Sequence, residues 1–442
     1  MTDCIESQRH FSFYPKQKLL LCFDGGQITS DAGLLLLRQF DQRHGLTAAL
    51  AEGLADERRS ASVDHLLPAL LRQRIYQIVA GYEDGNDANR LRHDATFQLL
   101  AERPPGELLA SQPTLSRWEN RFTMRDWVAM NGCLCRGFAQ LCRARVAAAG
   151  EIVLDIDSTA DPTYGQQEFS FYNGAYDRRV YHPLLVFERH TGYLLAAHLR
   201  RGEVGSSRGC VAVLRRLVRW LQREFPGVPI RLVGDAGFAI PDLYKFCERG
   251  KIEYSFGIGS NPAFQRESQA LVEKVARRWL RRGQRQCLYS SFRHRSKRWR
   301  QRSRRICCKA EHGSGGSSLR YVITNRPGTA AQVFDFYQHR GECENRIGEL
   351  KNGFAADRLS CQRFLANVFR LLLHASAYNL VALFRHRLPS SLRQAQIQTL
   401  RVRLFKLGAL ITRSVRRVVV HGASGWPFQR LWQNAFQAVA SG

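Results

Sequence analysis

Four side chains suited to binding phosphate and metal recur at helical spacing between residues 337 and 351. They are Tyr337, Arg340, Glu344 and Lys351. At ~100° per residue of a helix, they project within a sector of roughly 60°. One carboxylate flanked by two cations and a phenol suits a phosphate group and a metal ion. Taken alone, the stretch also fits a solvated helix with ion pairs, which is the usual role of such charges.

Two aspartates stand at the ends of predicted strands. Residues 152–157 alternate in a way that predicts a strand with Asp155 and Asp157 on one face. Asp157 ends this strand, and Asp235 follows a second predicted strand at 230–233. Ligand sites gather at strand ends in α/β sheets. Either aspartate alone is also typical of a turn or cap, and Asp155 is an alternative to Asp157.

Asp157, Asp235 and Glu344 together indicate one kind of chemistry. Carboxylates without a cysteine or histidine cluster suit hard cations, here Mg²⁺ or Mn²⁺. Two such ions can activate a water or a 3′-hydroxyl and stabilise the leaving oxygen of an in-line phosphoryl transfer. We therefore expect about two divalent ions in each site.

The order of predicted elements favours a mixed α/β sheet. After residue 151 come three strands, a helix, a strand, a short helix and a strand, so the first three strands form a meander. Residues before 151 are mainly helical. The expected division is 1–150, a helical DNA-binding region; 151–260, the first part of the core; 261–330, a basic β-rich insertion; 331–390, the second part of the core; and 391–442, a basic C-terminal region.

The charge of the chain indicates a polyanionic partner. A net charge of +28 on 442 residues, with a pI near 10.2, points to nucleic acid first. A membrane is the weaker reading, because there is no basic amphipathic anchor, no spanning segment and no signal peptide at the start. The 12 cysteines follow no zinc spacing, which indicates reduced thiols in a cytoplasmic protein.

The densest basic segment runs from residue 273 to 309 and is interleaved with aromatic residues. Basic and aromatic side chains together fit neutralisation of a DNA backbone plus stacking on an unpaired base. Trp299 is the candidate for stacking and Trp279 its rival. A β-hairpin with solvated arginines and packed tryptophans is the structural alternative.

These motifs resemble those of cut-and-paste bacterial insertion-sequence transposases of the DDE type, which have an RNase H-like core. The pattern Tyr337-x2-Arg340-x3-Glu344-x6-Lys351 is similar to their signature, and Leu154-Asp-Ile-Asp157-Ser-Thr159 and Val233-Gly-Asp235-Ala-Gly-Phe238 are similar to their two aspartate motifs. The gaps are 235 − 157 = 78 and 344 − 235 = 109 residues. The long second gap resembles the subgroup with a β-rich insertion. Residues 82–87, 91–94 and 111–117 also resemble one branch of the group.

The resemblance implies roles for these residues. Asp157, Asp235 and Glu344 would hold the metals, while Tyr337, Arg340 and Lys351 would bind phosphates near the cut end. Trp299 would stack on a flipped base. Strand cleavage at the element ends would precede attack of the freed 3′-hydroxyl on target DNA, with a homodimer in the synaptic complex and the protein at the bacterial nucleoid. A nuclease without strand transfer and a non-catalytic DNA-binding protein are the alternatives.

Overall fold

A computed structural model describes residues 9–58, 63–299 and 302–441. The chain forms two compact units. The first consists of Met1–Phe122, Gly353–Ala355 and Ser376–Gly442, and the second of Thr123–Asn352 and Ala356–Ala375. The predicted five-part division stays a prediction. Arg300, which belongs to the predicted basic segment, and residues 1–8 lie outside the described residues.

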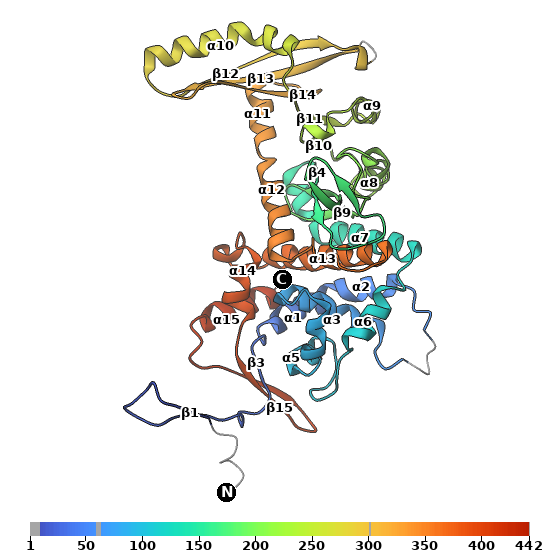
Figure 1. Cartoon of the computed structure of the whole chain (residues 1–442), viewed down its shortest axis with the longest axis vertical. Coiled ribbons are helices and arrows are strands. Elements are labelled where there is room, and N and C mark those ends of the chain that lie inside the picture. Colours follow the sequence, from blue (N-terminus) through green and yellow to red (C-terminus); the bar gives the residue numbers. More distant parts are fainter. Residues whose placement is uncertain (1–8, 59–62, 300–301, 442) are drawn as a thin grey trace. The chain divides into compact units, whose positions relative to one another are not determined.

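The second unit is built on an eight-stranded mixed sheet in the order β12-β13-β14-β11-β10-β4-β8-β9 (Figure 1). Its strands are β4 (Ile152–Ser158), β8 (Leu184–Glu188), β9 (Leu194–His198), β10 (Ile230–Gly234), β11 (Glu253–Ile258), β12 (Gln286–Arg295), β13 (Ser303–Gly313) and β14 (Gly316–Thr324). Strands β4, β8 and β9 form an antiparallel meander, and β10 and β11 run parallel to β4. The predicted mixed α/β core with an RNase H-like strand order is confirmed.

Helices cover the core strands, which are buried on both faces. Residues 152–157 of β4 are all buried. Helix α7 (Met124–Ala149) packs on β9, where the rings of Phe138 and Tyr193 lie 5.6 Å apart. Helix α8 (Cys210–Glu224) is amphipathic, and α9 (Pro241–Arg249) lays Tyr244 on Tyr254 of β11 at 5.5 Å. Together these contacts fix the sheet edge that carries Asp157 and Asp235.

The insertion extends the core sheet instead of forming a separate one. Strand β14 pairs with β11, β13 with β14 and β12 with β13, all antiparallel. Side chains alternate between faces, so Cys308 and Tyr321 face one helix, α10 (Pro262–Arg282), while Cys307 and Val322 face another, α11 (Ala330–Gln338). Figure 1 shows α10 running along β12 and β13. This helix was not predicted, because its arginines obscured the apolar stripe.

Residues 161–181 form a small three-stranded sheet that the sequence did not predict. Its order is β5-β7-β6, and its strands are β5 (Asp161–Pro162), β6 (Phe171–Asn173) and β7 (Arg178–Tyr181). It lies in the chain between β4 and β8, where a polar loop was expected. Strands of two to four residues carry almost no periodic signal.

The signature stretch is not one continuous helix. Helix α11 ends at Gln338, α12 (Gly341–Gly348) begins three residues later, and a π-helical segment covers Glu349–Gly353. A two-residue turn therefore interrupts the predicted helical face from 337 to 351, although His339 and Arg340 both keep helical backbone angles.

The first unit is mainly helical, as predicted for the N-terminal region. Its helices are α1 (Leu34–His44), α2 (Leu46–Gly53), α3 (Leu67–Ala80), α4 (Ala88–Leu91), α5 (Ala95–Leu100), α6 (Gln112–Glu119), α14 (Ile397–Leu400) and α15 (Gln429–Ser441). Strands β1 (Arg9–Phe11) and β2 (Leu19–Leu21) form a hairpin, and β3 (Ile28–Thr29), β15 (Ala409–Arg413) and β16 (Val418–Gly422) form a second sheet.

Among the described residues, one helix, α13 (Phe364–Arg385), is long and apolar enough to cross a membrane by length and composition. In its most apolar window, 89% of the residues are buried inside the protein. Such burial is typical of a core helix.

Candidate active site

Asp157 and Asp235 lie at the ends of neighbouring parallel strands. Strands β4 and β10 pair in the register Val233 with Asp155 and Gly234 with Ile156, so the next residue on each strand is a candidate carboxylate. The Asp157 side chain is nearly buried and accepts the backbone N–H of Ser158 at 2.8 Å. Burial raises the pKa of Asp157 to about 6, and the nearby Asp235 charge adds to the rise, while Arg340 opposes it. The sequence expectation that the two aspartates share one sheet edge agrees with this register.

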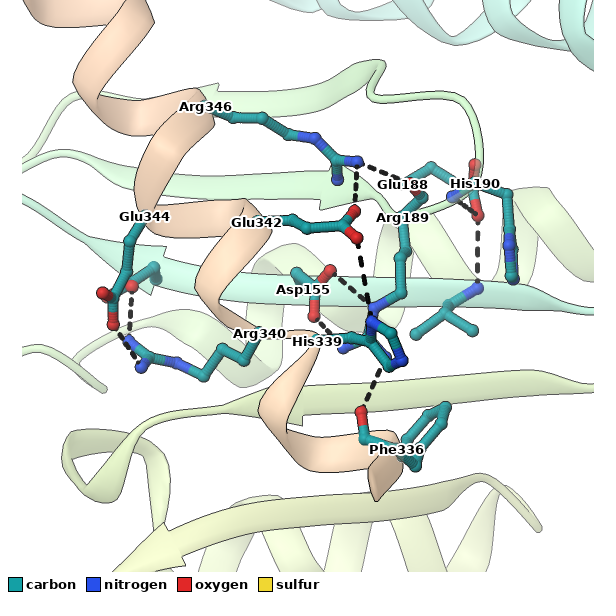
Figure 2. A network of polar contacts seen from close by, with 12 residues as sticks. Asp155, Glu188, Arg189, His190, Phe336, His339, Arg340, Glu342, Glu344 and Arg346 are labelled. Carbon is teal, nitrogen blue, oxygen red and sulfur yellow. Dashed lines mark hydrogen bonds and ion pairs between the residues drawn. The ribbon is translucent and has the colours of Figure 1, made fainter. Parts of the chain in front are cut away.

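Asp155 is engaged elsewhere. It is fully buried and accepts two hydrogen bonds from Arg189, at 3.0 Å from Nε and 2.6 Å from Nη2 (Figure 2). The same guanidinium donates to the Phe336 carbonyl at 3.0 Å. A buried carboxylate paired this way has both oxygens occupied. Between the two alternatives left open by the sequence, the geometry favours Asp157 as the reactive group.

Arg340 links two of the predicted acids. Its Nη2 donates to Asp157 Oδ2 at 2.7 Å, and its Nη1 donates to Glu344 Oε1 at 2.7 Å (Figure 2). The Arg340 side chain is largely buried, whereas that of Glu344 is 61% exposed. The guanidinium therefore occupies the space where a cation would balance these two carboxylates.

Tyr337 packs against the same sheet edge, where a glycine leaves room for its hydroxyl. Its hydroxyl lies against Gly257 near the end of β11, at 2.5 Å from where a Cβ on that residue would stand. Burial raises the pKa of Tyr337, and the Asp235 and Asp157 charges also raise it, against the effect of Arg340. The phenol and Arg340 thus lie at the same sheet edge as the two aspartates.

Lys351 holds the chain that follows β4. Its Nζ donates to the Ala160 carbonyl at 2.6 Å and to Thr159 Oγ1 at 3.2 Å, with Asp161 Oδ1 at 3.6 Å and Asp357 Oδ2 at 3.8 Å. Burial raises the pKa of Asp161 to about 8, with Asp357 adding to the rise and Lys351 opposing it. Asp161 and Asp357 were not singled out from the sequence, because only the fold brings them to the lysine.

The two candidate tryptophans lie in the insertion, away from this cluster. Trp299 is buried, and its ring meets those of Tyr244 at 6.1 Å and His294 at 5.5 Å. Trp279 is half-buried on α10, with its ring 4.9 Å from that of His312. The stacking role of Trp299 stays a prediction.

A second polar network, which the sequence did not reveal, holds α12 against the turn between β8 and β9 (Figure 2). Arg346 donates to the Arg189 carbonyl at 2.7 Å and to Glu342 at 3.1 Å. The buried Glu188 accepts the Thr191 N–H at 2.8 Å and its hydroxyl at 2.7 Å, which shapes the turn. Because Glu344 sits on α12, this network positions it.

Carboxylate oxygens are the donors that this edge offers to a metal. In the part of the chain that the structure describes, no group of three or more His, Cys, Asp or Glu side chains is arranged to hold a metal ion. Asp157 and Asp235 supply two of the predicted ligands, and Glu344 is joined to them through Arg340. The donor chemistry fits a hard divalent cation, provided that the Arg340 ion pairs open.

The strand order and its acidic edge define a nucleic-acid-processing enzyme of the DDE class. The model of the family described as transposase DDE domain group 1 matches residues 11–441, so the chain belongs to that family. It is a DNA transposase, an enzyme that transfers phosphoryl groups on DNA, and this family generally uses divalent metal ions.

Other comparisons are distant. Similar solved structures include the cryo-EM structure of the piggyBac transposase synaptic complex with hairpin DNA, at 13% identity and a TM-score of 0.41, over 85% of this chain and 80% of that one. No curated protein matches the chain.

Proposed function

We propose that this transposase cuts DNA at the ends of an insertion sequence and joins the freed 3′-hydroxyl to target DNA. The observation that carries the proposal is the meeting of Asp157 and Asp235 at neighbouring strand ends, with Arg340 linking Asp157 to Glu344. Water attacks the terminal phosphorus in the first step, and the 3′-oxygen leaves. In the second step that 3′-oxygen attacks a phosphorus of the target strand, whose own 3′-oxygen leaves.

Asp157, Asp235 and Glu344 are the proposed ligands of Mg²⁺ or Mn²⁺, with two ions in each site. Bound there, the ions supply a lowered pKa for the attacking water and charge that stabilises the transition state. Their carboxylate oxygens are the donors that these cations prefer. Glu344 completes the set when its ion pair with Arg340 opens, and its exposed side chain leaves room for that change.

Tyr337, Arg340 and Lys351 are the proposed phosphate-binding residues. Opening of the Arg340 ion pairs frees two donor nitrogens, and a guanidinium binds a phosphate through two parallel hydrogen bonds. The half-buried Tyr337 phenol orients a phosphate near Asp235. Lys351 combines this role with holding residues 159–161, since its side chain is only partly exposed.

The DNA partners are the terminal inverted repeats of the element and the target. We place the duplex-binding role in residues 1–150, and Trp299 in contact with a flipped base. A homodimer is the proposed synaptic form, in a bacterial cytoplasm and at its nucleoid. Light scattering of the full chain with and without end DNA tests the dimer.

The decisive experiment mixes purified protein with Mg²⁺ and DNA carrying the ends found beside its gene. Parent protein is expected to cut and to join, while Asp157→Asn and Asp235→Asn bind DNA but do neither. Asp242→Asn, an acid with a 78% exposed side chain, is the matched control and should behave as the parent. Cleavage without joined products would instead identify a nuclease. Binding without chemistry in either metal would identify a non-catalytic DNA-binding protein.

A further inference from the structure

The small sheet β5-β7-β6 adjoins the catalytic edge of the large one. Strand β4 runs directly into β5, and β7 leads into β8, whose Leu184 pairs with Ser158 at the end of β4. The small sheet therefore extends beyond the same strand ends that carry Asp157 and Asp235. Lys351 ties the junction at Thr159 and Ala160.

Large aromatic side chains are exposed along this sheet. Tyr164 is 85% exposed, Tyr172 58%, Phe169 47% and Tyr176 38%. Single exposed aromatics need no explanation, but four within 13 positions all belong to one small sheet and its turns. Exposed aromatic side chains gathered in one segment indicate a contact surface.

Arginines accompany these rings. The Arg201 guanidinium lies over Phe169 at 5.1 Å and over Phe171 at 4.8 Å, and it also pairs with Glu203 at 2.8 Å. Arg178 is exposed at the start of β7, and Arg179 donates to the Ser170 carbonyl. Positive charge beside aromatic faces suits a polyanion that also carries planar groups.

Contacts within the protein fix the shape of this surface. Gly202 packs so closely across the sheet that a Cβ would stand 2.1 Å from the Val180 carbonyl oxygen, and Asn173 donates to the Gly202 carbonyl at 2.7 Å. Phe169 has φ +59°, a left-handed conformation that is costly for an aromatic residue. Such strain persists only where surrounding contacts fix it, and it gathers at functional surfaces.

The patch reaches the catalytic carboxylates through Tyr176. Its ring packs edge-on against His182, with the centroids 5.6 Å apart. Burial raises the pKa of the Tyr176 phenol, and the Asp157 and Asp235 charges raise it further. His182 is two residues from Leu184, which pairs with Ser158, so Tyr176 lies close in the fold to the strand end that carries Asp157.

We infer that Tyr164, Phe169, Tyr172 and Tyr176, hereafter the aromatic platform, stack on unpaired bases of the DNA next to the cut. This inference rests on the proposed function, because it assigns a substrate region to the same site. DNA is the occupant because the arginines match its backbone charge and because the platform borders the carboxylates. A stacked base of any identity fits, since every base presents a π-face.

The test uses the full chain in EDTA and two DNA ends of the same length, one blunt and one with a short unpaired flank carrying 2-aminopurine. Parent protein is expected to bind the flanked end more tightly and to quench the probe by stacking. Tyr164→Ala/Tyr172→Ala is expected to weaken binding to the flanked end by about 10-fold or more, without changing affinity for the blunt end. Tyr172→Phe, which keeps the ring but loses the hydrogen bond to Asp177, should match the parent.

Phe23→Ala, at an 82% exposed aromatic of the first unit, controls for loss of any exposed ring. Equal affinity of parent and double variant for the flanked end, or equal losses on both ends, would overturn the inference. A double variant that binds normally but no longer self-associates would show that the patch contacts protein instead.

Different results would contradict the aromatic platform and the proposed function. Loss of the flanked-end preference in a protein that still cuts and joins would remove the platform alone. A protein that stacks the probe but never cuts in Mg²⁺ or Mn²⁺ would remove the proposed function alone.

Discussion

Arg340 and Asp157 form an ion pair of 2.7 Å between residues 183 positions apart in sequence. The pair brings the signature stretch to the end of β4. Because the same guanidinium also binds Glu344, one cation joins these two carboxylates. Phosphate binding and metal binding would then both begin with release of this arginine.

Replacing Arg340 by methionine tests this coupling. At pH 8 the variant leaves Asp157 buried without its partner, so we expect a loss of roughly 3 kcal/mol in the free energy of unfolding. Mn²⁺ should raise the melting temperature of the variant more than that of the parent, because the carboxylates no longer share a competing cation. Cleavage of end DNA should fall by at least about 10-fold, since a phosphate contact is lost.

Arg285→Met is the matched control for that experiment. Arg285 also pairs with a glutamate, Glu311 at 3.0 Å, but its own side chain is 72% exposed. Its loss should change stability by no more than about 1 kcal/mol and leave the response to Mn²⁺ as in the parent. Equal Mn²⁺ responses in Arg340→Met and the parent would contradict the coupling.

Gly257→Ala is expected to displace the Tyr337 hydroxyl. The new methyl group would stand 2.5 Å from that oxygen, so we expect destabilisation of about 1–3 kcal/mol and a decrease in DNA cleavage. Chemical denaturation and a cleavage assay measure the two effects. Gly259→Ala, which meets nothing within 4 Å, should be close to neutral.

Adding Tyr337→Phe to Gly257→Ala removes the clashing oxygen. The double variant should recover stability but not cleavage. If the double variant recovers neither stability nor cleavage, the strain arises elsewhere in β11.

Asp161→Asn is expected to change how stability depends on pH. The folded-state pKa of Asp161 is raised to about 8, so the folded protein keeps a proton that the unfolded chain releases near the ordinary aspartate pKa of 3.8. The stabilisation from this group is complete below the unfolded value and is lost as pH rises through about 8. Between those values the parent should lose about 1.4 kcal/mol per pH unit relative to the variant.

Urea denaturation from pH 5 to 9 measures this difference. Asp335→Asn, at an exposed acid on α11, should keep the slope of the parent. Parallel curves for the parent and Asp161→Asn would contradict the burial argument.

Arg189→Met should destabilise the protein by about 3–5 kcal/mol, because Asp155 would remain buried and unpaired. Asp155→Leu in the same chain should restore part of that loss. Thermal unfolding of the two single variants and the double variant gives the coupling energy. If the stability losses of the two single variants simply add up in the double variant, Asp155 has another partner.

The sequence predicted the elements with strong periodicity and missed those that depend on distant partners. The buried run of β4, the meander with β8 and β9 and the amphipathic α8 follow from local pattern. The two-residue turn at His339 and Arg340 does not, because both residues keep helical backbone angles and no proline precedes them. The small sheet was missed because its pairing joins short polar strands.

The sequence also predicted only part of the candidate site. Residue types and spacing nominated Asp157, Asp235 and Glu344, but not the choice between Asp155 and Asp157. That choice depends on Arg189, which lies 34 positions from Asp155. Only the fold brings Asp161 and Asp357 close to Lys351, so the sequence alone did not indicate them.

Strands β12, β13 and β14 share one backbone ladder with β11 and β10. The insertion and the strand that leads into Asp235 are therefore parts of one hydrogen-bonded sheet. A nucleic acid bound to the outer strands would contact the same sheet that ends at Asp235.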